Sequence, residues 1–209
     1  MTQLANRLDQ VMEQVSNIIK SKIIGPNRYE RIDIIADNYR HSSNIKRHEQ
    51  EVRDQSEKIE MKITMMISEN FKERVLHNSE NKQTFISLYF KFLQDNSKAT
   101  LEKFSCIQLF LSAEEECKLL TKESITDYNP LASNQPEADT RIILHASRIS
   151  EHNKVVIASP SGDTDIIVLA ISLLYNHENV IIMDGWGDNK ECLICLMLFL
   201  KWMKTVSKP

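Results

Sequence analysis

The chain has 209 residues, of which 42% are hydrophobic, so it is long enough for one domain with a sizeable core. Its formal net charge is −3, from 26 basic and 29 acidic side chains, which gives no global attraction to nucleic acid or to an anionic membrane. Four cysteines are too few for a disulfide-stapled secreted scaffold, and the first residues lack an apolar leader. We therefore expect an intracellular protein, in which the apolar run 192–200 is too short to span a membrane.

The first predicted element is an amphipathic helix over residues 4–23, where apolar side chains recur at three- and four-residue spacing. Gly25-Pro26-Asn27 ends this helix, and residues 1–28 form an N-terminal helix and turn. A short β-branched run over 32–36 then predicts a buried strand, which ends at Asp37.

The remaining predicted elements alternate along the chain. In the middle they are a solvated helix or loop over 42–60, a strand over 59–67, a helix over 81–93 and a strand over 104–111. No element is predicted over 114–135, where Asn129-Pro130 and the cluster over 133–136 mark a loop. After these come a helix over 137–150, a strand over 155–158, a helix over 166–174 and a strand over 180–183. This order predicts an α/β fold over residues 29–190, with a mainly parallel sheet and crossover helices, followed by an apolar and basic tail over 191–209.

Acidic residues follow several of these strands or open the helices that come next. In a parallel α/β sheet the carboxyl ends of the strands and the N-termini of the following helices share one edge, so we expect these acids on one rim. They are Asp37, Glu137, Asp139, Asp163, Asp165 and Asp184. Between residues 137 and 188 eight acidic side chains stand against three basic ones, so phosphate binding there would need cations.

Two interpretations of the rim are open. In the first, Glu137, Asp139, Asp163 and Asp165 form a carboxylate cluster for Mg²⁺ or Mn²⁺, which prefer oxygen ligands. Two such ions could activate a water molecule and stabilise the leaving oxygen of a phosphodiester. In the second, the same acids only cap helices and interact with their dipoles.

Two acidic motifs resemble a known family. EADTRI (137–142) followed, after a short strand, by DTDI (163–166) resembles the acidic core of PIN-like nucleases, particularly the flap-endonuclease branch. With RIDIIADNYR (31–40) and NSENK (78–82) before them, the motifs are more similar still to PIN-like proteins found dispersed with transposable elements in animal genomes. The resemblance covers about residues 31–188.

This resemblance implies a three-layer PIN-like α/β fold and a divalent-metal nuclease that acts on DNA or RNA. It implies that Glu137, Asp139, Asp163 and Asp165 are metal ligands. Asp37 would correspond to the opening aspartate of the family, and Asp184 is an additional candidate ligand.

The sequence departs from the family pattern in two places. Ser161-Gly162 separates Pro160 from Asp163, where the family has the acid directly after the proline. The flap-endonuclease branch also has a further acidic motif downstream, whereas the tail over 191–209 does not resemble the family. These departures predict a truncated or divergent copy, whose catalytic activity is in question even where the fold is kept.

Other chemistry-bearing residues have two interpretations each. Cys192-x-x-Cys195 has the spacing of half a zinc site or belongs to an apolar core. Arg141 and His145, one turn apart on the predicted helix, either approach a scissile phosphate or are solvated residues of the helix face. The basic residues between 40 and 58 either track a nucleic-acid backbone or, interleaved with acids, form a solvated face.

Three functions follow from these observations. The first is a metal-dependent nuclease that uses the acidic rim with Mg²⁺ or Mn²⁺. The second is a catalytically inactive PIN-like remnant that serves as an interaction module for protein or nucleic acid. The third is a phosphatase-like hydrolase in which Asp163 is the nucleophile and Asp165 the acid/base. The sequence does not determine the oligomeric state.

Overall fold

The computed structural model describes residues 3–22, 29–39, 79–149, 153, 155–159, 164–174, 176–177, 179–184 and 193–194. The predicted elements over 42–60 and 59–67 lie outside the described residues, as does the tail over 191–209 except 193–194.

The first sheet is mixed and has the order β1-β2-β3-β4 among the described strands. β1 (Tyr29–Ile35) pairs in parallel with β2 (Cys106–Ala113). These strands correspond to the predicted strands over 32–36 and 104–111. β2 then pairs antiparallel with β3 (Glu116–Leu120), and β3 with β4 (Ile125–Asp127).

β3 and β4 lie in the segment over 114–135, for which no strand was predicted, and their antiparallel pairing makes the first sheet mixed. β2 and β3 are joined by a turn of only two residues, Glu114 and Glu115, which permits a hairpin and not a crossover. All three residues of β4 are exposed, so no apolar alternation marked it as a strand. After β4 comes a short 3₁₀ helix, η2 (Asn129–Leu131), within the segment expected to be a loop.

The second sheet has the order β6-β5-β7 and is parallel in both described pairings. Its strands are β5 (Val155–Ser159), β6 (Val180–Asp184) and β7 (Leu193–Ile194). The helix α7 (Thr164–Leu173) connects β5 to β6, as the alternation of predicted elements required. The α/β class is therefore confirmed, with one mixed and one parallel sheet.

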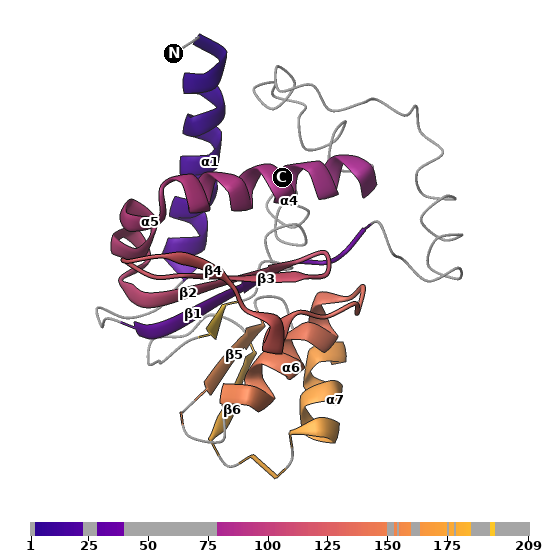
Figure 1. The fold of residues 1–209 in the computed structure, drawn as a ribbon. Helices are drawn as coiled ribbons and strands as arrows, with labels where there is room; N and C mark the ends of the chain where they lie inside the picture. The colour runs from indigo at the N-terminus through magenta and orange to yellow at the C-terminus, as the bar shows by residue number, and fades with distance from the viewer. Residues whose placement is uncertain are drawn as a thin grey trace.

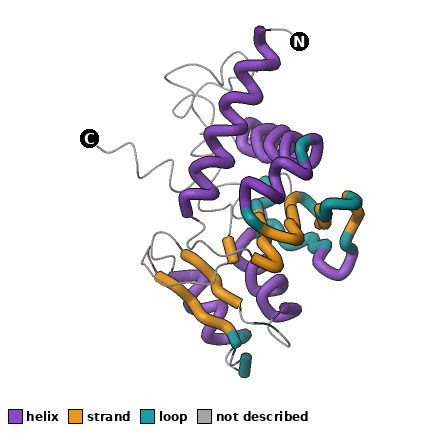
Figure 2. Tube along the Cα trace, turned by 90° about the vertical axis from the view of Figure 1, so that its left-hand side faces the viewer, coloured by secondary structure: helices purple, strands orange, loops and turns teal. Residues whose placement is uncertain are grey.

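Two long helices cover one face of the first sheet (Figures 1 and 2). They are α1 (Gln3–Lys22) and α4 (Ser79–Asp95), and the short α5 (Ser97–Phe104) follows α4. Met12 and Val15 of α1 and Phe85 of α4 are buried in one apolar cluster with Ile32 and Ile34 of β1. The predicted amphipathic N-terminal helix thus packs into the core of the chain. None of the helices described has both the length and the apolar character needed to cross a membrane.

The other side of the first sheet carries α6 (Ala138–Ile149) and α7 (Figure 1). Ile35 of β1 belongs to the apolar cluster beneath these helices, whereas its neighbour Ile34 belongs to the cluster under α1 and α4. Val156 and Ile157 of β5 divide between the same two clusters. Because alternate side chains of a strand point to opposite faces, β1 and β5 both separate the same pair of cores.

Candidate functional site

Asp37, just beyond β1, caps the N-terminus of α6. Its Oδ1 accepts a hydrogen bond from the backbone N–H of Ala138, with an N–O distance of 2.8 Å. Its Oδ2 accepts one from the hydroxyl of Tyr39, with an O–O distance of 3.1 Å. The first N–H groups of a helix have no partner within the helix, and a carboxylate satisfies them and interacts favourably with the helix dipole.

Glu137 and Asp139 are the sequence neighbours of Ala138, the residue whose N–H donates to Asp37. Asp139 lies in the first turn of α6 and is buried, with 7% of its surface exposed, while Glu137 is half-buried. The cap by Asp37 therefore places Asp37, Glu137 and Asp139, three of the predicted rim acids, at the start of one helix.

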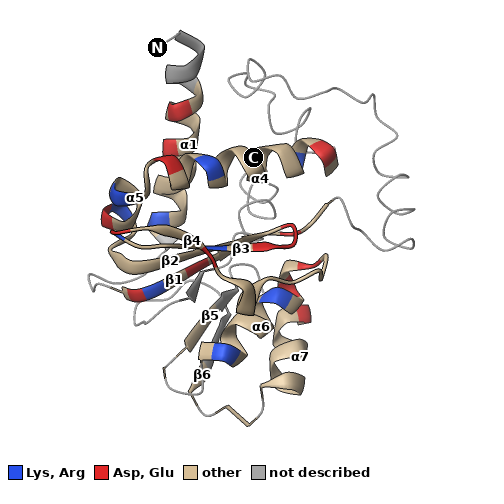
Figure 3. Cartoon of the chain, viewed as in Figure 1, with Lys and Arg blue, Asp and Glu red and all other residues tan. Residues whose placement is uncertain are grey.

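The other predicted acids come from α7 and the second sheet. Asp165 is exposed in the first turn of α7, which packs against α6, and Figure 3 shows acidic residues at the first turns of both helices. Asp163 lies outside the described residues. Asp184 ends β6, where its backbone pairs with Ser159 at the end of β5.

The donor chemistry of the rim suits a hard divalent cation, because carboxylate oxygens are the ligands that Mg²⁺ and Mn²⁺ prefer. Among the residues that the structure describes, however, no three His, Cys, Asp or Glu side chains form a group that could hold a metal ion. The acids at the start of α6 therefore form at most part of a metal site, and Asp163 and the side chain of Asp184 are outside the description.

The side chain of Arg141, one turn after the cap, is buried and does not lie at the surface. Its Nε donates to the carbonyl oxygen of Gln135 at 2.7 Å, and Nη2 donates to the carbonyl oxygens of Ser133, at 3.1 Å, and Glu114. Burial lowers the pKa of Arg141, and the negative charge of Asp37 opposes this shift. Both predicted roles of Arg141 are wrong, because its side chain is fully buried and binds the loop before α6 to the β2–β3 turn.

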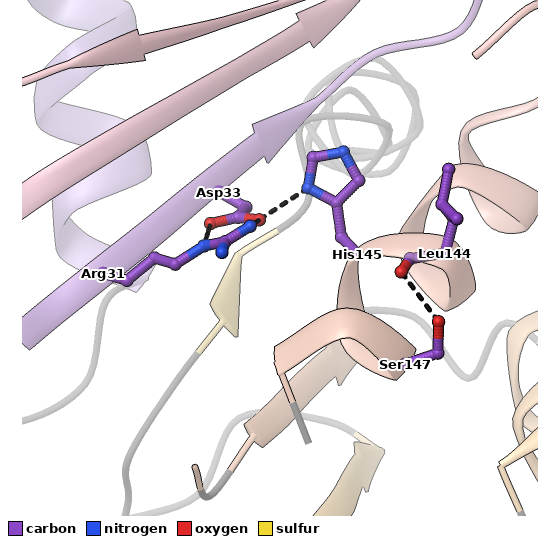
Figure 4. Close-up of polar contacts among 5 residues, drawn as sticks. All are labelled: Arg31, Asp33, Leu144, His145 and Ser147. Carbon is purple, nitrogen blue, oxygen red and sulfur yellow. Dashed lines mark hydrogen bonds and ion pairs between the residues drawn. The ribbon is translucent and has the colours of Figure 1, made fainter. Parts of the chain in front are cut away.

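His145, one turn further along α6, is also fully buried and contacts Asp33 of β1 (Figure 4). Its Nδ1 lies 2.5 Å from Oδ2 of Asp33. Arg31 binds the same carboxylate through Nε and Nη2, each at 2.6 Å. Burial alone would raise the pKa of Asp33, but the hydrogen bonds and charges of Arg31 and His145 lower it below its ordinary value. The predicted surface roles of His145 are therefore wrong as well.

This buried ion pair was not predicted from the sequence. One signal was present: Arg31 and Asp33 are two residues apart in an otherwise apolar strand, so both point to the same face and are well placed to pair. The guanidinium of Arg31 also lies 3.7 Å from the ring centroid of Phe110, which packs edge-on against Tyr128. The pairing of Asp33 with His145, however, joins a strand to a helix and depends on the fold.

The cysteines of the first sheet are structural. Cys106 and Cys117 are both buried. Burial and the nearby charge of Asp33 raise the pKa of Cys117 to about 12, against the opposing effects of Arg31 and Arg141. A thiol with so high a pKa is a poor nucleophile at neutral pH. The Cys192-x-x-Cys195 pair lies outside the described residues.

The site therefore consists of Asp37, Glu137 and Asp139 at the start of α6, with the buried Arg141 and His145 holding that helix in place. In comparisons with protein-family models, curated proteins and solved structures, nothing matches this chain.

Proposed function

We propose that this chain is a PIN-like phosphodiesterase that cleaves DNA or RNA with Mg²⁺ or Mn²⁺ at the acidic rim. The observation that carries the proposal is the hydrogen bond from the Ala138 N–H to Asp37, which joins two predicted acidic segments 101 residues apart. The order of layers supports it too, because helices lie on both sides of the first sheet, as a three-layer PIN-like fold requires.

The proposed roles follow from the positions of the side chains. Asp37 orients the start of α6, and Glu137 and Asp139 offer carboxylate oxygens from that turn. Asp165 in the first turn of α7 and Asp184 at the end of β6 are proposed as further ligands, and the sequence adds Asp163. The bound metal would supply water activation and charge stabilisation at the leaving oxygen. The substrate would contact the metals mainly through its phosphates, so base sequence would matter little.

Metal binding is the first test. Mn²⁺ is titrated into the purified chain by calorimetry, beside the variants Asp163→Asn and Glu137→Gln. Glu102→Gln, an exposed acid of α5, is the matched control. We expect the wild type and the control to bind equally and both rim variants to lose binding. Cleavage assays on single-stranded and flap substrates then follow, with metal omitted as the blank. Absence of binding by the folded wild type at millimolar Mn²⁺ would rule out the proposal.

A non-catalytic interaction module is the second candidate function. The observation that favours it is that both carboxylate oxygens of Asp37 accept hydrogen bonds within the protein, so this acid is already employed as a cap. In that case Asp37→Asn and Glu137→Gln change the stability of the protein. Added metal then changes no measured property of the wild type or of either variant. The phosphatase-like alternative remains a prediction, because its proposed nucleophile Asp163 is outside the described residues.

A further inference from the structure

We infer that the hydrogen bond between His145 and Asp33 is a positioning contact that sets the rotation and axial placement of α6, and thereby holds Asp139 beside the end of β1. The inference rests on the proposed function, in which Asp139 is a metal ligand. His145 itself is fully buried and touches no substrate, so its role is to position.

The first argument is geometric. Ala138 and His145 are seven residues apart, about two helical turns, so they lie on the same face of α6 about 10 Å apart. Their partners Asp37 and Asp33 are four residues apart, about 13 Å along an extended chain. The helix and the strand therefore run in opposite directions, and the two contacts join residues at corresponding positions along them.

Two contacts constrain a helix in a way that one does not. The Asp37 cap and the hydrogen bonds of Arg141 hold only the N-terminal part of α6, so the helix could still pivot about that end. The contact from His145 to Asp33, two turns beyond the cap, restrains this pivot. Apolar packing at this interface is tolerant of small rotations, whereas a hydrogen bond depends on distance and angle.

The direction of this hydrogen bond follows from the charge of Asp33. Asp33 is ionised, since its pKa is lowered, and Arg31 binds it through two hydrogen bonds. An ionised carboxylate only accepts hydrogen bonds, so Nδ1 of His145, 2.5 Å from Oδ2, carries the proton of this contact. The contact is thus directional, with His145 as donor.

This assignment allows a matched pair of variants. In His145→Asn the amide nitrogen is attached to Cγ, as Nδ1 is in histidine, so the donor is kept in place. In His145→Gln the amide lies one methylene further out and cannot take the same position. Both variants bury a neutral amide, so they differ mainly in where the donor lies.

Two measurements read out the position of α6. One is Mn²⁺ affinity by calorimetry. The other is the hydrogen-exchange rate of the Ala138 amide by NMR, which reports the cap by Asp37 whether or not a metal binds. We expect His145→Asn to resemble the wild type in both. We expect His145→Gln to bind Mn²⁺ about 10- to 100-fold more weakly, the usual loss when a residue that orients a ligand is removed, and to exchange Ala138 faster.

The outcomes separate this inference from the proposed function. If His145→Gln keeps both the Mn²⁺ affinity and the Ala138 exchange rate of the wild type, the inference is wrong. If the wild type binds no Mn²⁺, the proposed function fails, and the exchange rate of the Ala138 amide alone tests the inference. Faster exchange in His145→Gln than in His145→Asn supports the positioning contact. Equal exchange rates in the two variants overturn it. Should His145→Gln not fold, His145→Leu, which fills the site without any donor, takes the same two measurements.

Discussion

Asp37 and Ala138 are 101 residues apart in the chain, and the carboxylate of the first accepts a hydrogen bond from the backbone N–H of the second. A helix cap normally comes from the residue that directly precedes the helix. Here the cap comes from the end of a strand, so one hydrogen bond both satisfies the helix terminus and joins α6 to β1. Loss of this carboxylate therefore affects secondary and tertiary structure together.

Replacing Asp37 by alanine should lower the free energy of unfolding by about 1–2 kcal/mol, the usual cost of losing a helix cap. Asp37→Asn keeps an acceptor oxygen and should cost less. Urea denaturation at neutral pH measures both. Asp9→Ala, an exposed acid of α1, is the control and should change stability little. Equal stability of Asp37→Ala and wild type would show that the cap contributes nothing.

Asp33→Asn should lower the free energy of unfolding by about 3 kcal/mol at neutral pH, because it leaves one half of a buried ion pair without its partner. The pKa of Asp33 in the folded protein lies below its ordinary value of 3.8. The ionised carboxylate therefore contributes its stability above pH 3.8, and this contribution is lost as the pH falls through the lower, folded-state pKa.

The difference in unfolding free energy between wild type and Asp33→Asn should therefore be constant from pH 7 to pH 5 and shrink below pH 3.8. Urea denaturation over a pH series measures it. Asp127→Asn, which removes an exposed partner of Lys118, serves as the comparison and should cost about 0–1 kcal/mol. A difference that grows on acidification would contradict the lowered pKa.

Ser105→Gly should raise the free energy of unfolding by about 1 kcal/mol, the steric cost that a side chain incurs in the left-handed region. Ser105 follows α5 with φ 54° and ψ 42°, and its N–H donates to the carbonyl oxygen of Glu102. Glycine ends helices in this conformation without strain. Thermal unfolding measures the effect. Ser87→Gly, at an exposed position in the middle of α4, should instead destabilise, and a loss of stability in Ser105→Gly would contradict the expected steric relief.

The two faces of α7 should respond differently to mutation. Ile166 is fully buried and packs under α6, whereas Ile171 is 62% exposed on the same helix. Ile166→Ala should lower the free energy of unfolding by about 2–5 kcal/mol, and Ile171→Ala should stay within about 0.5 kcal/mol. Chemical denaturation of both variants compares them directly. A cost for Ile171→Ala as large as for Ile166→Ala would mean that another surface covers this face.

Much of the fold was predictable because its signals are local. The apolar spacing of Phe85, Leu88, Tyr89 and Phe92 predicted α4, and the short apolar runs predicted β1 and β5. β4 gave no such signal, because none of its three side chains is buried. The antiparallel part of the first sheet was therefore missed, since no element was predicted over 114–135.

The site was predictable only in part, for a related reason. Asp37, Glu137 and Asp139 were assigned to one rim from strand ends and helix starts, which are properties of the chain order. The buried roles of Arg141 and His145 depend on partners more than one element away: a polar residue in an amphipathic helix has the same local pattern whether it faces water or a buried carboxylate.

The topology of the first sheet also has a consequence for the order of folding. β2 and β3 are joined by two residues and can pair within microseconds, whereas β1 pairs with β2 across about 70 intervening residues and must close a long loop first. The contacts of Asp33 and Asp37 with α6 close still longer loops, so we expect them to form late in folding. Substitutions at these two positions should therefore accelerate unfolding while leaving the rate of folding nearly unchanged.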